Sequence, residues 1–313
     1  MLATDGSKRA STRAVNEADF LSALRGLPLH PGAMNLSDDA ARLSEFVLTK
    51  DLLVEGVHYL PGDSAGDVAW KLMAVNLSDL AAKGAAPVGV LLGYPLGEDA
   101  WDRAFLKGLR AACEAFACPL LGGDTVRGVG LRTLSLTAIG RAGPKVPLRS
   151  GAQAGHTLWV AGTIGDAGLG LALAMSGMGP SVLLEAYRRP MPLIEAGCAL
   201  GPVVTAMCDV SDGLLIDTAR MAAASQCGAV IDLSCIPRSP AARELAGSSR
   251  EARLEAATAG DDYALLFALP HGTSPPVEAR RVGWFEAGFG LRLIDGGESV
   301  PLPASLGWEH GRD

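Results

Sequence analysis

The chain has 313 residues, of which 49% are hydrophobic and 19% are charged. This composition excludes an intrinsically disordered chain, and the length is enough for about two domains with buried cores. The formal net charge is −7, whereas nucleic-acid binding needs a concentration of basic residues. We therefore expect no nucleic acid as a partner.

Nothing in the sequence indicates export or a membrane span. Residues 1–20 are polar and lack the apolar core of a signal peptide, and no run of about 18 apolar residues occurs. The six cysteines form no CxxC pair, which is typical of buried, reduced thiols. We therefore expect a cytoplasmic protein without membrane contact.

The first half of the chain alternates helix-like and strand-like patterns. A helix is predicted to begin near Glu17, and apolar residues recur at helical spacing over 66–84 and 99–117. Strands are predicted over 45–49, 87–96, 118–121 and 133–139, with 87–96 buried. The strand over 118–121 is predicted to end in the turn Gly122-Gly123-Asp124.

The segment 142–155 is rich in Gly, Pro and Ala, and we interpret it as a linker between two domains, 1–143 and 144–313. Strands are predicted after it over 157–161, 206–210, 229–233, 263–268 and 291–294. Helices are predicted over 165–177, 193–205 and 212–225. This mixture indicates an α+β fold.

Aspartates recur in short turns, most of which follow an apolar run. They lie in the segments Ser37-Asp38-Asp39, Thr49-Lys50-Asp51, Asn76-Leu77-Ser78-Asp79, Gly122-Gly123-Asp124, Asp209-Val210-Ser211-Asp212-Gly213 and Gly260-Asp261-Asp262. Any one of them alone is typical of a helix cap or an ordinary turn. Together, converging carboxylates would repel one another unless cations neutralise them. The set therefore predicts several Mg²⁺ ions and a phosphate-bearing ligand such as ATP.

Asp79 has two interpretations. It lies within an apolar helix, with Asn76 three residues before it and Lys83 four residues after it on the same face. Its carboxylate either pairs with Lys83 or points into a site.

Common nucleotide-binding and hydrolase motifs are absent. The sequence contains no GxxxxGK[ST], no strict GxGxxG, no HExxH and no GxSxG. Glycines at 162, 165 and 168 would permit close approach of a phosphate to the backbone, or simply a tight turn between a strand and a helix.

The order of the acidic motifs resembles that of the thiamine-monophosphate kinase family. The resemblance rests on SDDAA, LTKDLLVEGVHY, AVNLSDLAAKGA, LLGGDTVRG, LRSGAQAG, DVSDGLLID and GDDYALLF, and it spans about residue 17 to Trp308. It implies the two-domain, α+β fold of the aminoimidazole ribonucleotide synthetase-like superfamily, in a homodimer whose N-terminal domains pair into a β-barrel. It also implies direct transfer of the ATP γ-phosphate to thiamine monophosphate.

The resemblance implies roles for individual residues. The Mg²⁺ ligands would be Asp39, Thr49, Asp51, Asp79, Asp124, Asp209 and Asp212, of which Asp124 and Asp212 would be catalytic. The ATP contacts would be Gly123, Asp124, Arg149 and Ser211. The substrate contacts would be His58, Asp261 and Trp308, although His58 has the alternative of an ordinary polar residue and Trp308 that of a core residue.

Four residues depart from the pattern of this family. Ser37 and Asp261 stand where relatives usually have Gly and Glu, and Leu106 stands where a nucleotide-contacting Tyr is frequent. Lys50 replaces a Ser or Thr that helps to bind metal, and a charged lysine cannot ligate Mg²⁺. We therefore expect an active enzyme with fewer bound metals than its relatives.

Two alternatives stay open at this point. One is another ATP-dependent synthetase of the same superfamily, although the lack of cysteine in residues 1–40 argues against a selenophosphate synthetase. The other is a catalytically inactive protein that binds thiamine phosphate or ATP, for which Lys50 is the main support.

Overall fold

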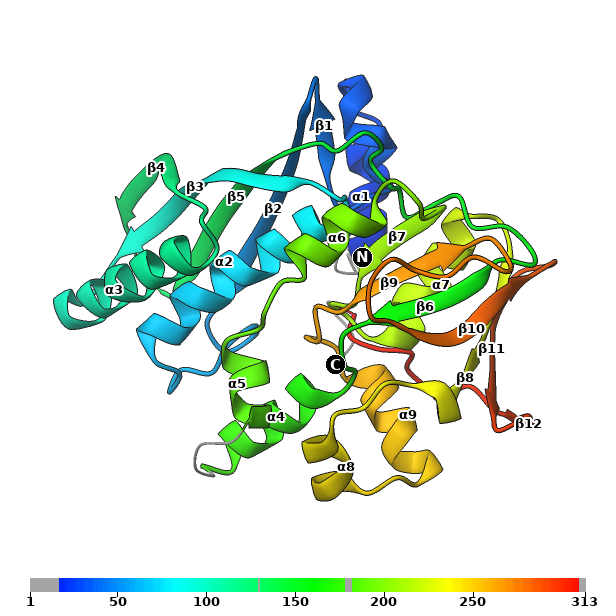
Figure 1. Cartoon of the computed structure of the whole chain (residues 1–313). Helices are drawn as coiled ribbons and strands as arrows, with labels where there is room; N and C mark the ends of the chain where they lie inside the picture. The colour runs from blue at the N-terminus through cyan, green and yellow to red at the C-terminus, as the bar shows by residue number, and fades with distance from the viewer. Residues whose placement is uncertain (1–16, 129, 178–181, 310–313) are drawn as a thin grey trace, which may run out of the picture.

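The computed structural model describes residues 17–128, 130–177 and 182–309, which form two β-sheets and the helices that cover them (Figure 1). The first sheet has the strand order β1-β2-β5-β3-β4, in which only β3 and β4 are parallel neighbours. Its strands are β1 (Ala41–Leu43), β2 (Phe46–Val54), β3 (Ala86–Leu96), β4 (Leu120–Arg127) and β5 (Thr133–Arg141).

The helix α2 (Ala65–Ala82) packs against one face of this sheet, with α3 (Asp99–Ala115) beside it. Ser64 caps α2, because its side chain accepts a hydrogen bond from the Asp67 amide at 3.1 Å. Most residues of α2 are buried, and each large apolar side chain among them contributes about 1.5–3 kcal/mol of burial. At its C-terminal end, Ala81 and Ala82 pack into the core of the second sheet. One helix therefore contacts both halves of the molecule.

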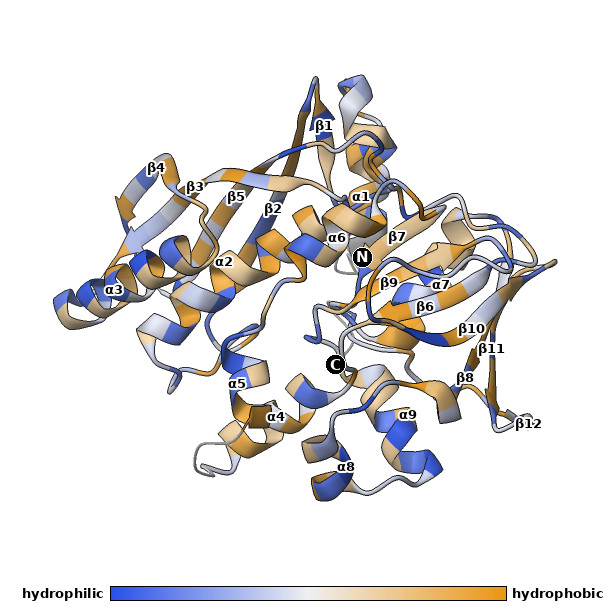
Figure 2. Cartoon of the chain, in the orientation of Figure 1, coloured by the Kyte–Doolittle hydropathy of each residue, from blue (hydrophilic) through white to orange (hydrophobic). Residues whose placement is uncertain are grey.

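The second sheet has the strand order β12-β11-β8-β10-β6-β9-β7, in which only β8 and β11 are parallel neighbours. Its strand β9 is fully buried and is drawn almost entirely in the hydrophobic colour (Figure 2). The strands are β6 (Thr157–Ala161), β7 (Ala206–Asp209), β8 (Gly228–Asp232), β9 (Leu265–Leu269), β10 (Arg280–Glu286), β11 (Gly290–Asp295) and β12 (Glu298–Val300).

The remaining helices lie around these sheets. They are α1 (Glu17–Leu24), η1 (Pro31–Leu36), α4 (Asp166–Met175), α5 (Val182–Arg188), α6 (Ile194–Leu200), α7 (Leu214–Ala224), η2 (Leu233–Cys235), α8 (Pro240–Ala246) and α9 (Arg250–Ala259). Helix α6 packs on α2, and α7 contacts β7, β8 and β11. No helix within the described ranges combines the length and the apolar character needed to cross a bilayer.

Most predicted elements of the first half are present, but two predictions about its strands are wrong. The segment Gly122-Gly123-Asp124 lies inside β4 rather than in a turn after a strand over 118–121. Strand β3 is buried on one face only, since Leu91 is 40% exposed.

In the second half, the helix predicted over 193–205 is shorter and ends at Leu200. The elements α5, α8, α9, β10 and β12 were not predicted. The polar residues 1–16 and the residues 310–313 lie outside the described ranges.

The face of the first sheet opposite α2 and α3, here called the outer face, carries apolar residues that nothing in the described chain covers. The paired rows of the sheet place Leu52, Leu91 and Val126 on it, and these residues are 48%, 40% and 56% exposed. The sheet is open in the single chain, so the predicted barrel between subunits stays a prediction.

Candidate active site

Four carboxylates from different segments lie close together where the two sheets meet. Asp39 follows η1, Asp51 lies on the face of β2 that α2 covers, Asp79 lies in α2, and Asp209 ends β7. Three of these residues come from the first half of the chain and one from the second. We call this set the acidic cluster.

Three of these carboxyl groups have raised pKa values, because they are buried and lie close to other negative charges. Burial raises the pKa of Asp51 to about 6 and that of Asp209 to about 8, and the neighbouring Asp39 adds to both shifts. Burial also raises the pKa of Asp79 well above its ordinary value, with further contributions from Asp51 and Asp209. The cluster therefore holds protons near neutral pH unless a cation replaces them.

Two cations lie at one side of the cluster. Arg149 forms an ion pair with Asp39, and Lys83 forms one with Asp38 and lies 3.7 Å from Asp39. Burial opposes ionisation of Asp39, but Arg149 and Lys83 outweigh it and lower its pKa. Lys83 thus pairs with the Ser37-Asp38-Asp39 segment, and of the two interpretations of Asp79 the structure favours the one in which its carboxylate points into a site.

Uncharged groups of α2 form hydrogen bonds with the acidic cluster and with Thr49 beside it. The Ser78 hydroxyl donates a hydrogen bond to Asp209 Oδ2 at 2.6 Å, which joins the two halves of the chain. The Asp51 amide donates to Asn76 Oδ1 at 3.2 Å. The Thr49 hydroxyl donates to the Asn76 carbonyl at 3.1 Å, so its lone pairs stay available to a ligand.

Asp212 and Ser211 lie just before α7, next to the acidic cluster in sequence. Asp212 forms an ion pair with Arg220, and its amide donates to Asp217 Oδ2 at 3.1 Å. Burial and the Asp212 carboxylate raise the pKa of Asp217 to about 7. The Asp212 carbonyl accepts a hydrogen bond from the Trp308 amide at 2.9 Å, which places the C-terminal segment beside this loop. Trp308 is 53% exposed, so its interpretation as a core residue is wrong.

The predicted substrate contacts His58 and Asp261 also lie near each other, because one lysine bonds to both residues. Lys71 donates to the His58 carbonyl at 3.1 Å and to Asp261 Oδ2 at 2.7 Å. His58 follows β2, whereas Asp261 follows α9 in the second half of the chain. The two halves of the molecule therefore meet here as they do at the acidic cluster.

Asp124 does not join the acidic cluster within one chain. The register pairs Leu52 with Ser135, Ser135 with Gly93, and Gly93 with Asp124, so this row of side chains shares the outer face. Asp51 lies on the inner face, three strands away or about 14 Å by strand spacing. The strand of Asp124, β4, is the edge of the sheet farther from the second half of the molecule (Figure 1).

At Gly123, beside Asp124, the neighbouring strand leaves no room for a side chain. A Cβ atom there would lie 1.9 Å from the Leu92 carbonyl oxygen of the neighbouring parallel strand. The glycine is needed for this close pairing of β3 and β4.

Lys50 lies on the outer face as well, and its ammonium donates to the Ser135 hydroxyl at 2.6 Å. It therefore does not stand in front of Asp51 on the inner face. Leu106, the other departure from the nucleotide-binding pattern, is exposed on α3.

The acidic cluster has the donor set that Mg²⁺ prefers, which is a group of hard carboxylate oxygens. Asp39 Oδ2 is buried and has no hydrogen-bond partner, and burial keeps three neighbouring carboxyls ready to exchange a proton for a metal ion. Within the described ranges, no three His, Cys, Asp or Glu side chains already stand in a metal-binding arrangement. The residue types fit Mg²⁺, and their side chains would have to reorient to bind it.

The sequence patterns do not identify several residues of the site. Lys71, Ser78, Tyr263 and Arg220 each bond to a predicted site residue. A signal exists for Lys71 alone, because it is a lysine in the apolar run of α2. The others have no pattern that distinguishes them from ordinary polar residues.

Comparison with known proteins gives matches over most of the chain. Residues 37–142 match the family model described as AIR synthase related protein, N-terminal domain, and residues 153–295 match the corresponding C-terminal domain. A thiamine-monophosphate kinase from Caulobacter vibrioides is 39% identical, over 90% of this chain and 86% of that protein.

Two solved structures are similar throughout their length. The thiamine-monophosphate kinase from Stenotrophomonas maltophilia is 35% identical with a TM-score of 0.73, covering 90% of this chain and 96% of that one. A structure described as AaThiL complexed with AMPPCP and TMP is 27% identical with a TM-score of 0.82, covering 95% of this chain and 97% of that one.

Proposed function

Because the chain belongs to the thiamine-monophosphate kinase family, we propose that it transfers the γ-phosphoryl group of ATP to thiamine monophosphate. The products are thiamine diphosphate and ADP. A bond forms between an acceptor phosphate oxygen and the γ-phosphorus, and the bond from that phosphorus to the bridging oxygen of ADP breaks. The acceptor phosphate is already largely ionised near neutral pH, so the transfer needs no side chain as a general base.

One observation carries this proposal beyond the family match, namely the convergence of Asp39, Asp51, Asp79 and Asp209 where the two halves meet. Buried carboxylates with raised pKa values are costly for stability and are typical of functional sites. Their charge suits a polyphosphate only through bridging metal ions.

The acidic cluster would hold several Mg²⁺ ions, with Thr49 and Asp212 at its margins. Bound Mg²⁺ would neutralise the charge that collects on the transferred phosphoryl group. Arg149 would add a guanidinium charge for the ATP phosphates, and Ser211 a nearby polar contact. His58, Asp261 and Trp308 would contact thiamine monophosphate, with the exposed Trp308 ring stacking on a ring of the substrate.

The working form is proposed to be a homodimer, with the outer faces of two first sheets packed together. The exposed apolar residues of the outer face favour a second copy as the covering surface. Gly123 and Asp124 lie on the edge strand β4, and we propose that in this dimer they reach past the edge of the partner's sheet to the nucleotide held at the partner's acidic cluster. Asp124 would then complete the site from the partner chain.

The deciding assay is the conversion of thiamine monophosphate to thiamine diphosphate with MgATP. We expect product with one ADP formed for each thiamine diphosphate. Tight binding of thiamine monophosphate or ATP without turnover would instead identify an inactive binding protein. ATP consumption that needs a different acceptor would identify another synthetase of the superfamily.

A further inference from the structure

Helix α2 carries a lysine that is 2% exposed, Lys71. A buried ammonium group is unfavourable unless it is paired and hydrogen-bonded, so a protein rarely keeps one without a structural or functional reason. The family resemblance implies no role for Lys71.

Three different segments surround the Lys71 ammonium. It donates to Asp261 Oδ2 at 2.7 Å and to the His58 carbonyl at 3.1 Å. It also lies 4.3 Å from the ring centroid of Tyr187 on α5, at the distance of a cation–π contact. Lys71 therefore connects the two proposed substrate contacts, which come from opposite halves of the chain.

Asp261 is held in one orientation on its protein side. The Tyr263 hydroxyl donates to Oδ1 at 2.9 Å while Lys71 occupies Oδ2, and the Asp261 amide donates to the Ser211 carbonyl at 2.7 Å. Its backbone φ of 61° lies in the left-handed region, which few residues other than glycine adopt and in which aspartate is enriched. The side chain is still 35% exposed, so a ligand can contact it.

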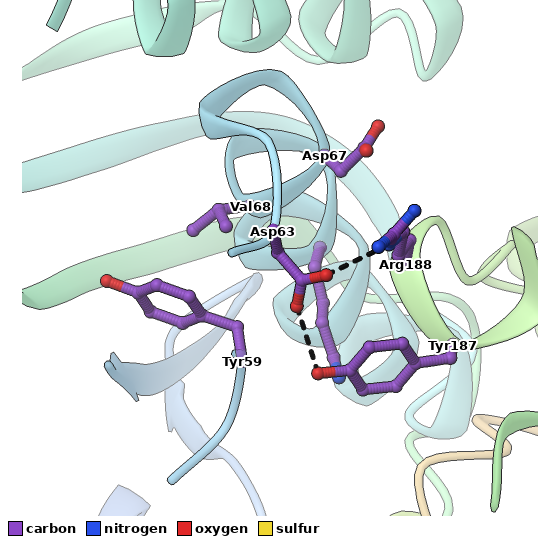
Figure 3. A pocket seen from close by; sticks show the side chains of 7 residues that line it. Tyr59, Asp63, Asp67, Val68, Tyr187 and Arg188 are labelled. Carbon is purple, nitrogen blue, oxygen red and sulfur yellow. Dashed lines mark hydrogen bonds and ion pairs between the residues drawn. The ribbon is translucent and has the colours of Figure 1, made fainter. Parts of the chain in front are cut away.

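The segment after His58 is anchored in the same region. Figure 3 shows Asp63 between Tyr187 and Arg188, with the Tyr187 hydroxyl 3.0 Å and Arg188 Nε 2.9 Å from its carboxylate oxygens. The Val54 amide donates to His58 Nδ1 at 3.1 Å, which fixes the imidazole at the end of β2. Both ends of this loop are therefore held in place, one by β2 and the other by α5.

We propose that Lys71 is a positioning residue for thiamine monophosphate. It fixes the Asp261 carboxylate and the His58 segment at one separation, so that both can contact the same substrate molecule. This inference rests on the proposed function, because it assumes that Asp261 and His58 meet the phosphate acceptor rather than ATP.

The test compares Lys71→Met, Asp261→Asn and the double variant in steady-state kinetics. We expect Lys71→Met to raise the KM for thiamine monophosphate by about 10- to 100-fold, the range for losing a hydrogen bond to a charged group. The KM for MgATP should stay within about two-fold, and kcat should fall less than the acceptor KM rises. Because Lys71 acts partly through Asp261, the acceptor KM of the double variant should rise by less than the product of the two single effects.

Two results would overturn the inference. One is an unchanged acceptor KM in a folded Lys71→Met variant, and the other is a double variant whose effects multiply. If Lys71→Met does not fold, Lys71→Arg replaces it, because this change keeps the positive charge in the buried site but alters the separation from Asp261 Oδ2 and the His58 carbonyl. An unchanged acceptor KM in Lys71→Arg then overturns the inference equally. Failure of the wild-type protein to phosphorylate thiamine monophosphate would instead overturn the proposed function.

Discussion

Asp51 and Asp124 project from opposite faces of one five-stranded sheet. Asp51 faces α2 and the acidic cluster, whereas Asp124 faces outward from the edge strand β4 in the same row as Leu52. One chain therefore cannot present both carboxylates to one metal–nucleotide complex unless the strands rearrange. In the proposed homodimer, the missing carboxylate would come from the partner chain.

We predict that two inactive variants restore each other in a mixed dimer. Asp124→Asn and Asp209→Asn should each lose most activity as homodimers, because each lacks one metal-binding charge. A dimer with one chain of each kind would contain one site with all its carboxylates, so it should have about half the wild-type kcat. The measurement is kinase activity of heterodimers isolated through two different affinity tags.

The control for this experiment is a heterodimer of Asp79→Asn with Asp209→Asn. Both residues belong to the same cluster in one chain, so both sites of this dimer stay damaged. Activity restored in that control, or absent from the Asp124 pair, would contradict a site shared between subunits.

The stability of the metal-free protein should fall as pH rises from about 4 to about 8. The pKa values of Asp51 and Asp209 are raised in the folded chain to about 6 and about 8, above the unfolded value near 3.9. The folded state thus holds protons that the unfolded chain has lost, and rising pH removes this advantage. Scanning calorimetry in EDTA should show Tm decreasing through this window.

Mg²⁺ should counter this loss, because the metal takes the place of the protons. The increase in Tm caused by Mg²⁺ should therefore be larger at pH 8 than at pH 5. A Tm in EDTA that rises through the window would contradict the assignment of raised pKa values.

Removing the Ser78 hydroxyl should raise the Mg²⁺ concentration needed for half-maximal activity. The hydroxyl donates to Asp209 Oδ2 at 2.6 Å and favours its ionised form, which is the form that binds metal. Ser78→Ala should also lower the free energy of unfolding by about 1–3 kcal/mol. Ser64→Ala is the matched control, because it removes the α2 cap at a cost of about 1 kcal/mol without touching the cluster. If both variants need the same Mg²⁺ concentration for half-maximal activity, Ser78 has no role in metal binding.

Gly123→Ala should destabilise the first sheet. Its Cβ would lie 1.9 Å from the Leu92 carbonyl oxygen, so β3 and β4 would have to separate, at a cost of about 1–3 kcal/mol. At Gly62 no atom lies within 4 Å of the place that a Cβ would take, and Gly62→Ala should change stability by less than about 0.5 kcal/mol. Urea unfolding of both variants makes the comparison, and equal midpoints would disprove the close approach.

Local patterns in the sequence were enough to predict most helices and strands, and the aspartate turns were enough to predict an acidic site. They misplaced Gly122-Gly123-Asp124, because two glycines are typical of a turn. The reason for Gly123 is instead the Leu92 carbonyl of a parallel neighbour, which is distant in sequence.

The face on which a residue lies could not be predicted for the same kind of reason. The placement of Asp124 opposite Asp51 depends on the register of four strands, which local periodicity does not contain. Helical spacing likewise allowed Asp79 to pair with Lys83. The actual partner of Lys83 is Asp38, forty-five residues earlier, because both are buried at the same contact between segments.

Helix α2 also fixes the distance between the two proposed regions of the active site. Lys71, at the proposed acceptor end, and Asp79, in the acidic cluster, are eight positions apart in one continuous helix, which is about 12 Å at the rise of an α-helix. The acceptor region and the metal region are therefore held apart by one continuous helix rather than by the segment that connects the two halves of the chain. Removing a single residue from this stretch would turn one end by about 100° relative to the other. The number of residues between these two side chains is therefore constrained.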